Sequence, residues 1–489
     1  MSTSPLGPRA AGLLLHPTSL PGTRTTGDFS HSAYRFIEFA AAAGFRVWQV
    51  LPLSPTHPDG SPYNAVSMFA GDPALISRDW LVDRGWLRID EAVAETENGE
   101  DVLALAARRF DETATAEQQA ELRRFTRRES AWLADYALYQ SLRHDRELEP
   151  WWQWPAGLRD RDPAALEKAR HRLDAAIRAR VFTQYVFDSQ WSELRGYAGR
   201  HGIRVFGDMP LYVSPDSADV WSRQDLFKLT CGRARTVTGV PPDYFSDIGQ
   251  IWGQPTFDWP AHAADGKHGY DWWVQRFRRL RELYDIVRID HFRGLAAGYE
   301  IPAGAETALD GQWVPAPGEA ILRQVFRRLG RFPIVAEDLG TITPDVIALR
   351  DQFRLPGMRV YQFGFDGDPA NPHLPHTYPT NAVAYTGTHD NPTTVGWWET
   401  LDSAARDAVL RYLGPRGESV PGAVLRSVLA STANLAITPL QDLLELPDSA
   451  RMNRPGTATG NWGWRFDWDQ LPPAVGERAY GLNRTYGRV

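Results

Sequence analysis

Four acidic residues of this chain each follow a short apolar segment. They are Asp208, Asp290, Glu337 and Asp390. Carboxylates that share one site raise one another's pKa, so burying them is costly unless they are paired or used in a reaction. Glycosidic bond chemistry needs such a pair, with one carboxylate acting as nucleophile or base and the other donating a proton to the leaving oxygen. The pattern therefore favours chemistry on sugars.

The stretch DIVRIDHFRG, residues 285–294, places a cation beside one of these acids. Arg288 lies two residues before Asp290, and side chains two apart on a strand point to the same face. A guanidinium there stabilises the ionised carboxylate, which suits a nucleophile. His291 and His389 each adjoin a carboxylate and can donate hydrogen bonds to sugar hydroxyls. Taken alone, Asp290 could instead cap a turn with Arg288 as a structural partner, so the case for chemistry depends on the rest of the chain.

The elements that would position these residues alternate along the sequence. Short apolar runs typical of buried strands alternate with amphipathic helical patterns such as residues 31–44 and 271–284. The candidate strands are residues 12–20, 45–53, 203–213, 285–292, 332–339, 358–365, 382–390 and 435–444. Eight strands that alternate with helices predict an α/β fold of the parallel (β/α)8 (TIM) barrel type, whose catalytic residues lie where strands end. The four carboxylates meet that requirement.

We expect residues 1–489 to form a single catalytic barrel with additions. Residues 84–185 show helical spacing and predict a helical insertion subdomain. Residues 238–259 carry Pro, Gly and aromatic residues without periodicity, which predicts a long active-site flap loop. The basic cluster at residues 276–282 is typical of a solvated helix face. The chain ends soon after residues 460–466, so no C-terminal β-domain is expected.

Net charge and cysteine content limit the kinds of partner and the cellular compartment to be expected. A net charge of −7 and a pI near 6.0 give no reason to expect nucleic acid or an anionic membrane as partner. The single cysteine, Cys231, excludes an intramolecular disulfide and a multi-cysteine metal site, and it fits a reducing compartment, so we expect a cytoplasmic protein. The N-terminal segment has the pattern of neither a signal peptide nor a membrane span. No metal and no organic cofactor are expected, because phosphate-cradling glycine motifs and HExxH are absent from the sequence.

Several blocks of the sequence occur in an order that is highly specific. Three contain the acids: RIDHFRG (288–294), VAEDLG (335–340) and TGTHDN (386–391). Others are LLHPTSLPG (14–22), SPYNAVSMFAGDP (61–73), GDMPLYV (207–213), GVPPDYFSDIGQIWGQP (239–255) and RMNRPGTATGNW (451–462). Over nearly the whole chain this set resembles the amylomaltases, which are the 4-α-glucanotransferases of glycoside hydrolase family 77 within the α-amylase superfamily.

The resemblance implies roles for the acids and for residues around them. It implies that Asp290 is the nucleophile, that Glu337 is the acid and then the base, and that Asp390 binds sugar hydroxyls and favours the distorted ring. The substrate-binding residues that it implies are Arg288, His291, His389, Asp208, Ser61, Tyr63, Tyr244, Phe245, Asp247, Gln250, Trp252 and Asn461. The flap with Tyr244, Phe245 and Asp247 would arch over bound glucan and help keep water out. Packing in loops is an alternative reading for Tyr63 and Trp252, and a turn-forming role is one for Asn461.

The implied reaction transfers a segment of an α-1,4-glucan donor to the 4-hydroxyl of glucose or a maltooligosaccharide acceptor, with retention and with cyclisation left open. An α-glucan hydrolase of the α-amylase type is the alternative, since both reactions share a covalent intermediate. General α-amylases carry an Asn-His pair where this chain reads GDMPLYV, which favours the amylomaltases. A glucan-binding protein without activity would have lost at least one of the three acids. Oligomeric state and preferred chain lengths are left open.

Overall fold

The computed structural model describes residues 5–22, 24–93, 100–242, 247–415 and 417–489. Eight parallel strands form one sheet in the order β11-β8-β3-β2-β1-β14-β13-β12. They are β1 (Ala10–Leu14), β2 (Val47–Gln49), β3 (Arg204–Met209), β8 (Ile286–Ile289), β11 (Ile334–Ala336), β12 (Gly357–Val360), β13 (Ala382–Tyr385) and β14 (Leu435–Pro439). The predicted (β/α)8 barrel is confirmed, and every predicted strand segment contains or overlaps one of these strands.

The barrel closes between its first and last strands in the sheet order. The Ala336 amide at the end of β11 donates to the Pro356 carbonyl just before β12, at 2.9 Å. The Asp338 carboxylate then accepts from the Met358 amide at 2.7 Å. These contacts continue the sheet across the gap between β11 and β12, so the mouth is ringed by strand ends on all sides.

Side chains alternate between the inside of the barrel and the layer of helices around it. Ile286, Val335 and Tyr385 belong to the interior cluster, whereas Val287 and Ala336 pack in the outer core. Both sets are fully buried, as expected for short parallel strands covered on both faces. Inward positions therefore recur at every second residue, and the next inward residues beyond the strand ends face the mouth.

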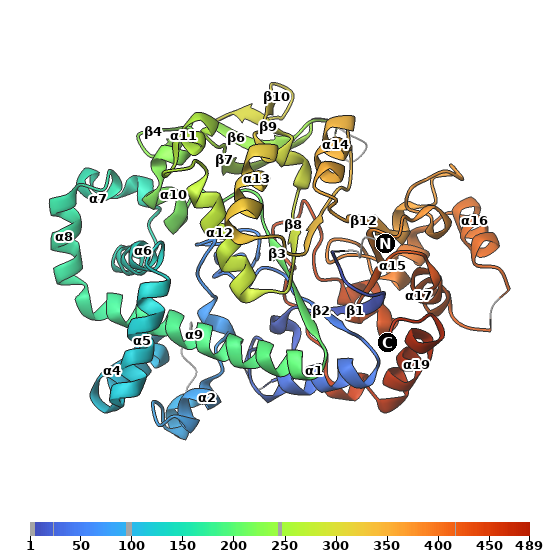
Figure 1. Ribbon diagram of the computed structural model, residues 1–489, viewed down its shortest axis with the longest axis horizontal. Coiled ribbons are helices and arrows are strands. Elements are labelled where there is room, and N and C mark those ends of the chain that lie inside the picture. The colour runs from blue at the N-terminus through green and yellow to red at the C-terminus, as the bar shows by residue number, and fades with distance from the viewer. Residues whose placement is uncertain (1–4, 23, 94–99, 243–246, 416) are drawn as a thin grey trace.

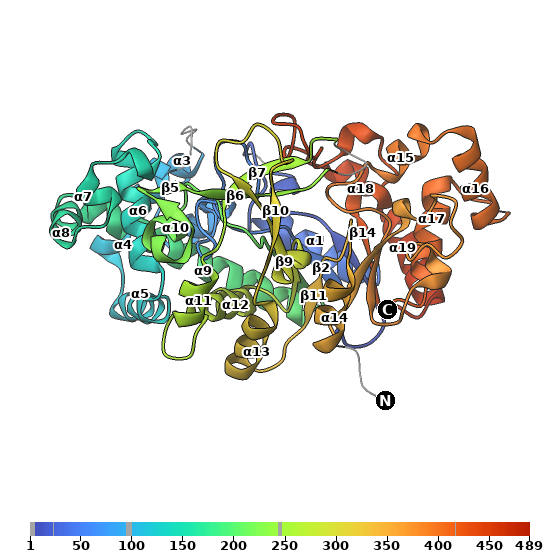
Figure 2. The same cartoon turned by 90° about the horizontal axis from the view of Figure 1, so that it is seen from above.

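Helices surround the strands and extend the molecule to both sides (Figures 1 and 2). Helix α1 (His31–Ala42) connects β1 to β2. The helices between β2 and β3 are α2 (Arg78–Asp83), α3 (Ile89–Ala92), α4 (Glu100–Thr113), α5 (Ala116–Arg128), α6 (Leu133–Asp145), α7 (Ala156–Arg159), α8 (Pro163–Arg172) and α9 (Asp174–Arg200). Helix α9 is continuous through residue 185 and packs against α1 and β3, so it joins the outlying helices to the barrel wall.

The later helices complete the wall and the opposite side. They are α10 (Ala218–Ser222), α11 (Trp259–Ala264), α12 (Asp271–Leu283), α13 (Gly318–Leu329), α14 (Pro344–Gln352), α15 (Thr394–Thr400), α16 (Ser403–Leu413), α17 (Val420–Ala430), α18 (Leu440–Leu443) and α19 (Pro473–Thr485). Helices α15 to α19 gather on the side away from α4 to α8 (Figure 1). No helix in the described ranges is long and apolar enough to cross a membrane.

The segment 238–259, expected to be a loop, contains regular structure. Strands β6 (Thr236–Val240) and β7 (Gln250–Pro255) join β9 (Ala297–Pro302) and β10 (Gln312–Pro315) in an antiparallel sheet of order β10-β9-β6-β7. A further hairpin consists of β4 (Leu229–Thr230) and β5 (Arg233–Ala234). Alternation failed to reveal β6 and β7 because β6 pairs with β9, some sixty residues away, and that partner supplies the hydrogen bonds.

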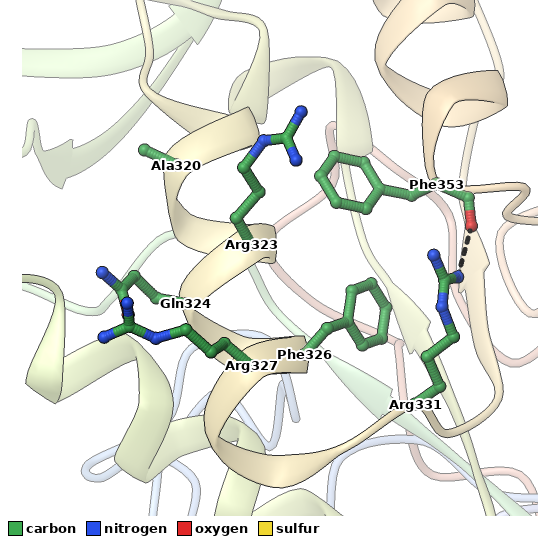
Figure 3. A pocket seen from close by; sticks show the side chains of 7 residues that line it. All are labelled: Ala320, Arg323, Gln324, Phe326, Arg327, Arg331 and Phe353. Carbon is green, nitrogen blue, oxygen red and sulfur yellow. Dashed lines mark hydrogen bonds between the residues drawn. The ribbon is translucent and has the colours of Figure 1, made fainter.

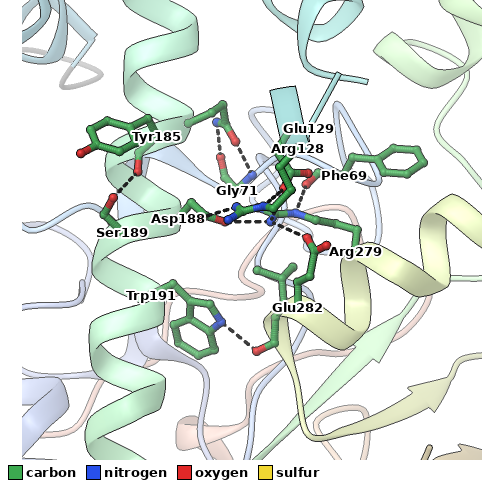
Figure 4. A network of polar contacts seen from close by, with 12 residues as sticks. Phe69, Gly71, Arg128, Glu129, Tyr185, Asp188, Ser189, Trp191, Arg279 and Glu282 are labelled. Atoms are coloured by element: carbon green, nitrogen blue, oxygen red, sulfur yellow. Dashed lines mark hydrogen bonds and ion pairs between the residues drawn. The ribbon is translucent and has the colours of Figure 1, made fainter. Parts of the chain in front are cut away.

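The prediction that the basic cluster at 276–282 forms a solvated helix face is wrong. Arg276 and Arg279 on α12 are buried, whereas Arg278 and Arg281 are exposed. Arg279 donates to the Phe69 carbonyl at 3.1 Å and lies 2.8 Å from the Asp188 carboxylate, as Figure 4 shows. The guanidinium thus links α12 to α9 and to the loop after β2. Helical spacing alone did not reveal this, because carboxylates on distant elements provide the compensation for burial.

The Arg279 network generates a stability prediction. We expect Arg279→Met to lower the free energy of unfolding by about 3 to 5 kcal/mol, because the largely buried Asp188 and the buried Glu129 lose a cation. Arg278→Met, on the exposed face of the same helix, is the matched control and should change it by less than about 0.5 kcal/mol. Urea titration followed by circular dichroism measures both. Equal effects of the two substitutions would contradict the role of Arg279.

Candidate active site

Parallel register places an arginine and an aspartate side by side at the mouth of the barrel. Arg288 on β8 and Asp208 on β3 are paired positions of neighbouring strands, so both side chains point the same way. Asp290 follows two residues after Arg288 on that inward face. The positions continue the interior alternation of Ile286 and Phe206, which form apolar packing below them. The charged layer therefore lies directly on the apolar filling of the barrel.

Arg288 bridges two carboxylates. Its Nη1 lies 2.9 and 2.7 Å from the two carboxylate oxygens of Asp208 and 2.9 Å from Oδ1 of Asp290. Burial raises the pKa of Asp208, and the guanidinium opposes that effect. The Asp208 side chain is fully buried, whereas 30% of the Asp290 side chain is exposed. Asp290 is thus the member of the group that a ligand in the mouth can reach.

Glu337 comes from the next strand end and is fixed by backbone amides. Its two carboxylate oxygens accept from the His291 amide at 2.7 Å and from the Leu339 amide at 2.9 Å. Burial, with the nearby Asp290 charge adding to it, raises the pKa of Glu337 to about 7, although Arg288 opposes the shift. The side chain can therefore hold a proton near neutral pH, as a general acid must.

His291 adopts a left-handed backbone conformation, with φ of 47°, directly after Asp290. Such a conformation is strained for a residue with a side chain, and it persists only where neighbours enforce it. Here Glu337 stabilises the conformation: its carboxylate accepts from the His291 amide, and its backbone carbonyl accepts from the Phe292 amide. Burial lowers the pKa of the His291 imidazole to about 4, so the ring is neutral at physiological pH.

Asp390 follows β13 and is held by a loop from the end of the chain. Its carboxylate lies 3.2 Å from His389 Nε2 and accepts from the Asn453 amide group at 2.6 Å. Arg451 donates to the Asp390 carbonyl at 2.5 Å. Although burial favours the protonated form, His389 and Asn453 outweigh it and lower the pKa of Asp390 to about 2. The third carboxylate is therefore ionised across the physiological range.

Tyr63 connects the loop after β2 to this group. Its hydroxyl donates to Asp208 at 2.8 Å, and its ring stacks on His389 with centroids 5.1 Å apart. The hydroxyl of Ser61 accepts from the Tyr63 amide at 3.3 Å and so shapes the turn that presents the ring. Loop packing thus accounts for only part of what Tyr63 contacts, because its hydroxyl also forms a hydrogen bond with the buried Asp208.

The remaining expected site residues divide into those near the acids and those that are not. Trp252 on β7 packs edge to face on His291 with centroids 4.8 Å apart, and it donates to Gln250 at 3.3 Å. Asp247 is exposed before β7. Within the described part of the chain, Asn461 forms hydrogen bonds inside its own loop, accepting from the Arg454 amide and donating to Thr457, which agrees with the turn-forming alternative. Tyr244 and Phe245 lie outside the described residues.

Sequence reasoning missed side chains that support the acids. Arg451 and Asn453 fix Asp390, although the resemblance of the block 451–462 assigns a role to neither residue. His16, at the end of β1, is buried, and its Nδ1 has no hydrogen-bond partner among the described residues. Burial and the nearby His389 lower the pKa of His16 to about 3. The only available signal was that His16 ends an apolar strand, as the acids do.

A hollow of about 550 Å³ elsewhere on the surface has different chemistry (Figure 3). The described residues that line it come from α13 and the segments beside it: Ala320, Arg323, Gln324, Phe326, Arg327, Arg331 and Phe353. None of these is a carboxylate, so this hollow offers no acid pair for glycosidic chemistry. In the described part of the chain no cluster of three or more His, Cys, Asp or Glu side chains could hold a metal.

The barrel and the ring of carboxylates at its mouth define a carbohydrate-active enzyme of the (β/α)8 class. Comparison with known proteins agrees with that class. A family model described as 4-alpha-glucanotransferase matches residues 15–470. The 4-alpha-glucanotransferase of Thermus thermophilus is 44% identical, and one from a Synechocystis species is 43% identical, each over 99% of both chains. The amylomaltase from Streptococcus agalactiae, solved in complex with acarbose, has a TM-score of 0.94 at 35% identity and covers 98% of this chain, with 99% of its own length matched.

The chain therefore belongs to the 4-alpha-glucanotransferase family, whose members include the amylomaltases. The expected resemblance is confirmed. By this membership the protein is a transferase, and the alternative of an α-amylase-type hydrolase is not favoured.

The raised pKa of Glu337 generates a prediction about stability. A carboxyl with a pKa of about 7 in the folded protein and 4.5 when unfolded favours folding most below pH 4.5, and this contribution is lost as the pH rises through 7. Glu337→Gln removes the titration, so between pH 5 and 8 the variant should gain up to about 3 kcal/mol relative to the unsubstituted protein. A constant loss should accompany this gain, because glutamine can accept only one of the two amide hydrogen bonds.

Urea titrations of both proteins at pH 5, 6, 7 and 8 measure this change. The readout is the slope of the difference in unfolding free energy with pH, which the constant loss does not affect. Parallel stability profiles for the two proteins would contradict a raised pKa at Glu337.

Proposed function

We propose that this enzyme transfers a segment of an α-1,4-glucan to the 4-hydroxyl of glucose or of another α-glucan by a retaining double displacement. One observation carries the assignment of roles: Arg288 lies between the buried Asp208 and the accessible Asp290, while Glu337 on the next strand has a pKa of about 7. Glu337 can thus hold a proton near neutral pH, which suits an acid, and Asp290 lies beside a guanidinium where a ligand can reach it, which suits a nucleophile.

In the first half-reaction, Asp290 attacks the anomeric carbon and forms a β-linked ester. The bond to the leaving sugar oxygen breaks, and Glu337 gives its proton to that oxygen. In the second half, Glu337 takes the proton from the 4-hydroxyl of the acceptor, which attacks the same carbon and releases Asp290. Two inversions give net retention, and both carboxyls return to their starting forms.

The other side chains would bind the reacting sugar. Asp390, ionised and fixed by His389 and Asn453, is suited to accept hydrogen bonds from ring hydroxyls. A neutral His291 and the ring of Trp252 pack together, and His291 lies close to Asp290. The flap residues Tyr244, Phe245 and Asp247 keep their proposed role in covering bound glucan and excluding water, which favours transfer over hydrolysis. Gln250 keeps its proposed role as a substrate-binding residue. The single cysteine supports a reducing, cytoplasmic location.

Incubation with maltotriose tests the transfer reaction. We expect glucose and a ladder of shorter and longer maltooligosaccharides, with a constant concentration of reducing ends, because each cleaved bond is replaced by a new one. Asp290→Asn should lower the rate by about 10⁴-fold or more, since the nucleophile is lost. Asp402→Asn is the matched control: Asp402 caps α16 away from the mouth, and asparagine caps equally well.

Chromatography of the oligosaccharides and a reducing-end assay supply the measurements. A steady rise in reducing ends with only shorter products would show a hydrolase. Full activity in Asp290→Asn would overturn the assignment of the nucleophile.

The pKa of Glu337 also predicts a pH dependence of transfer. The acid must be protonated to act, so kcat/KM for maltotriose should fall about tenfold per pH unit above pH 7. Neither His291, with a pKa of about 4, nor Asp390, with a pKa of about 2, can produce a limb there.

A donor with a fluoride leaving group separates this effect from others, because fluoride departs without protonation. With α-maltotriosyl fluoride the rate of the glycosylation step should no longer fall above pH 7. The Glu337→Gln variant should still release fluoride. A limb near pH 4.5, or the same limb with both donors, would contradict Glu337 as the acid.

A further inference from the structure

Trp462 adds a third ring to the stack beside the catalytic carboxylates. Its ring centroid lies 5.9 Å from that of Tyr63 and 6.1 Å from that of His389, and the latter two rings are nearly parallel. Tyr63 reaches Asp208, and His389 reaches Asp390. The indole is partly exposed, unlike most tryptophans of the core. Part of its surface is therefore open to a ligand beside Tyr63 and His389.

The backbone at Trp462 is held in an unfavourable conformation. Its φ is 65°, in the left-handed region, which a bulky aromatic residue rarely adopts. The Trp462 amide donates to the Met452 carbonyl at 2.8 Å, and the side chain of Asn461 closes the loop through Arg454 and Thr457. Strain of this kind persists where surrounding contacts enforce it, and it gathers at ligand sites. Here the enforced conformation directs the indole toward Tyr63 and His389.

The same loop supplies the partners of Asp390. Asn453 and Arg451 hold its side chain and carbonyl, so the indole and the third carboxylate are fixed by one segment, residues 451–462. An aromatic face beside an ionised carboxylate suits a sugar, because the ring stacks on the apolar face of the pyranose while the acid accepts from its hydroxyls. Among the described residues, the indole N–H has no hydrogen-bond partner and is available to a hydroxyl.

We propose that Trp462 is a binding residue for a glucose unit of the glucan chain, stacking on the unit that lies next to the one held by Asp390. This inference rests on the proposed function and deepens it, because it identifies an aromatic contact to the sugar in addition to the hydrogen bonds of the acids. The resulting contact is to bound sugar and not to the reacting atoms, so it should act on affinity more than on the chemical step.

Three substitutions separate the ring from the strained backbone. Trp462→Ala and Trp462→Gly both remove the ring, and glycine also relieves the strain at φ of 65°. Trp462→Phe keeps an aromatic face but loses the N–H. Tyr480→Ala is the control, since Tyr480 is an exposed ring on α19, among the outer helices and away from the ring stack.

Binding of acarbose, the ligand in the related Streptococcus agalactiae structure, is measured by titration calorimetry alongside KM and kcat for maltotriose. We expect the Kd for acarbose and the KM to rise about tenfold in both the alanine and glycine variants and by less than about threefold in the phenylalanine variant. The value of kcat should change less than KM, and Tyr480→Ala should match the unsubstituted protein.

Unchanged acarbose affinity in Trp462→Ala would overturn the proposal. So would normal affinity in Trp462→Gly together with a loss in Trp462→Ala, because that result would mean that only the backbone of the loop matters. A fall in kcat alone would also overturn it, by showing that the ring acts through the position of Asp390. Transfer by the unsubstituted protein is scored separately from maltotriose products, so failure of the proposed function is distinguishable from failure of this inference.

Discussion

The contact of Arg288 with Asp208 and Asp290 is the interaction on which the rest of the site depends. A buried guanidinium or carboxylate alone would be costly, but here each compensates the other at the base of the mouth. Asp208 is fully buried and serves as the fixed partner, which leaves Arg288 oriented toward the more exposed Asp290. The ion pair thereby fixes the carboxylate that we propose as the nucleophile, in a position that a ligand can reach. Tyr63 extends the same group toward the loops by its hydrogen bond to Asp208.

This charge arrangement is possible because the barrel is filled with apolar side chains up to the layer below. Ile286, Phe206 and Val335 occupy the inward positions of their strands, and the next inward positions are the charged ones. The low polarity beneath raises the pKa of Glu337, while partners at the rim keep Asp390 ionised. One mouth therefore holds carboxyls with opposite tendencies, according to how many donors each one has.

Much of the fold and of the central site could be predicted, and the failures have identifiable causes. Strand positions and the acids that end them follow from local apolar runs, because short parallel strands are buried on both faces. The sheet of β6, β7, β9 and β10 could not be predicted in this way, since its hydrogen bonds join segments far apart in the chain. Arg276 and Arg279 looked solvated because helical spacing cannot reveal that carbonyls and carboxylates of other elements surround them. The supports of Asp390 at Arg451 and Asn453 lie some sixty residues beyond it.

The sequence by itself determined the class of architecture, the identity of the four acids and their place at strand ends. The periodicity of strands and helices and the type of side chain are local properties, and they are readable without a partner. Only the tertiary structure decided which carboxyl is protonated, which is ionised and which side chains hold them. Those properties depend on burial and on the distance to charges and donors brought together from β3, β8, β11, β13 and the loop 451–462, and no local pattern encodes such distances.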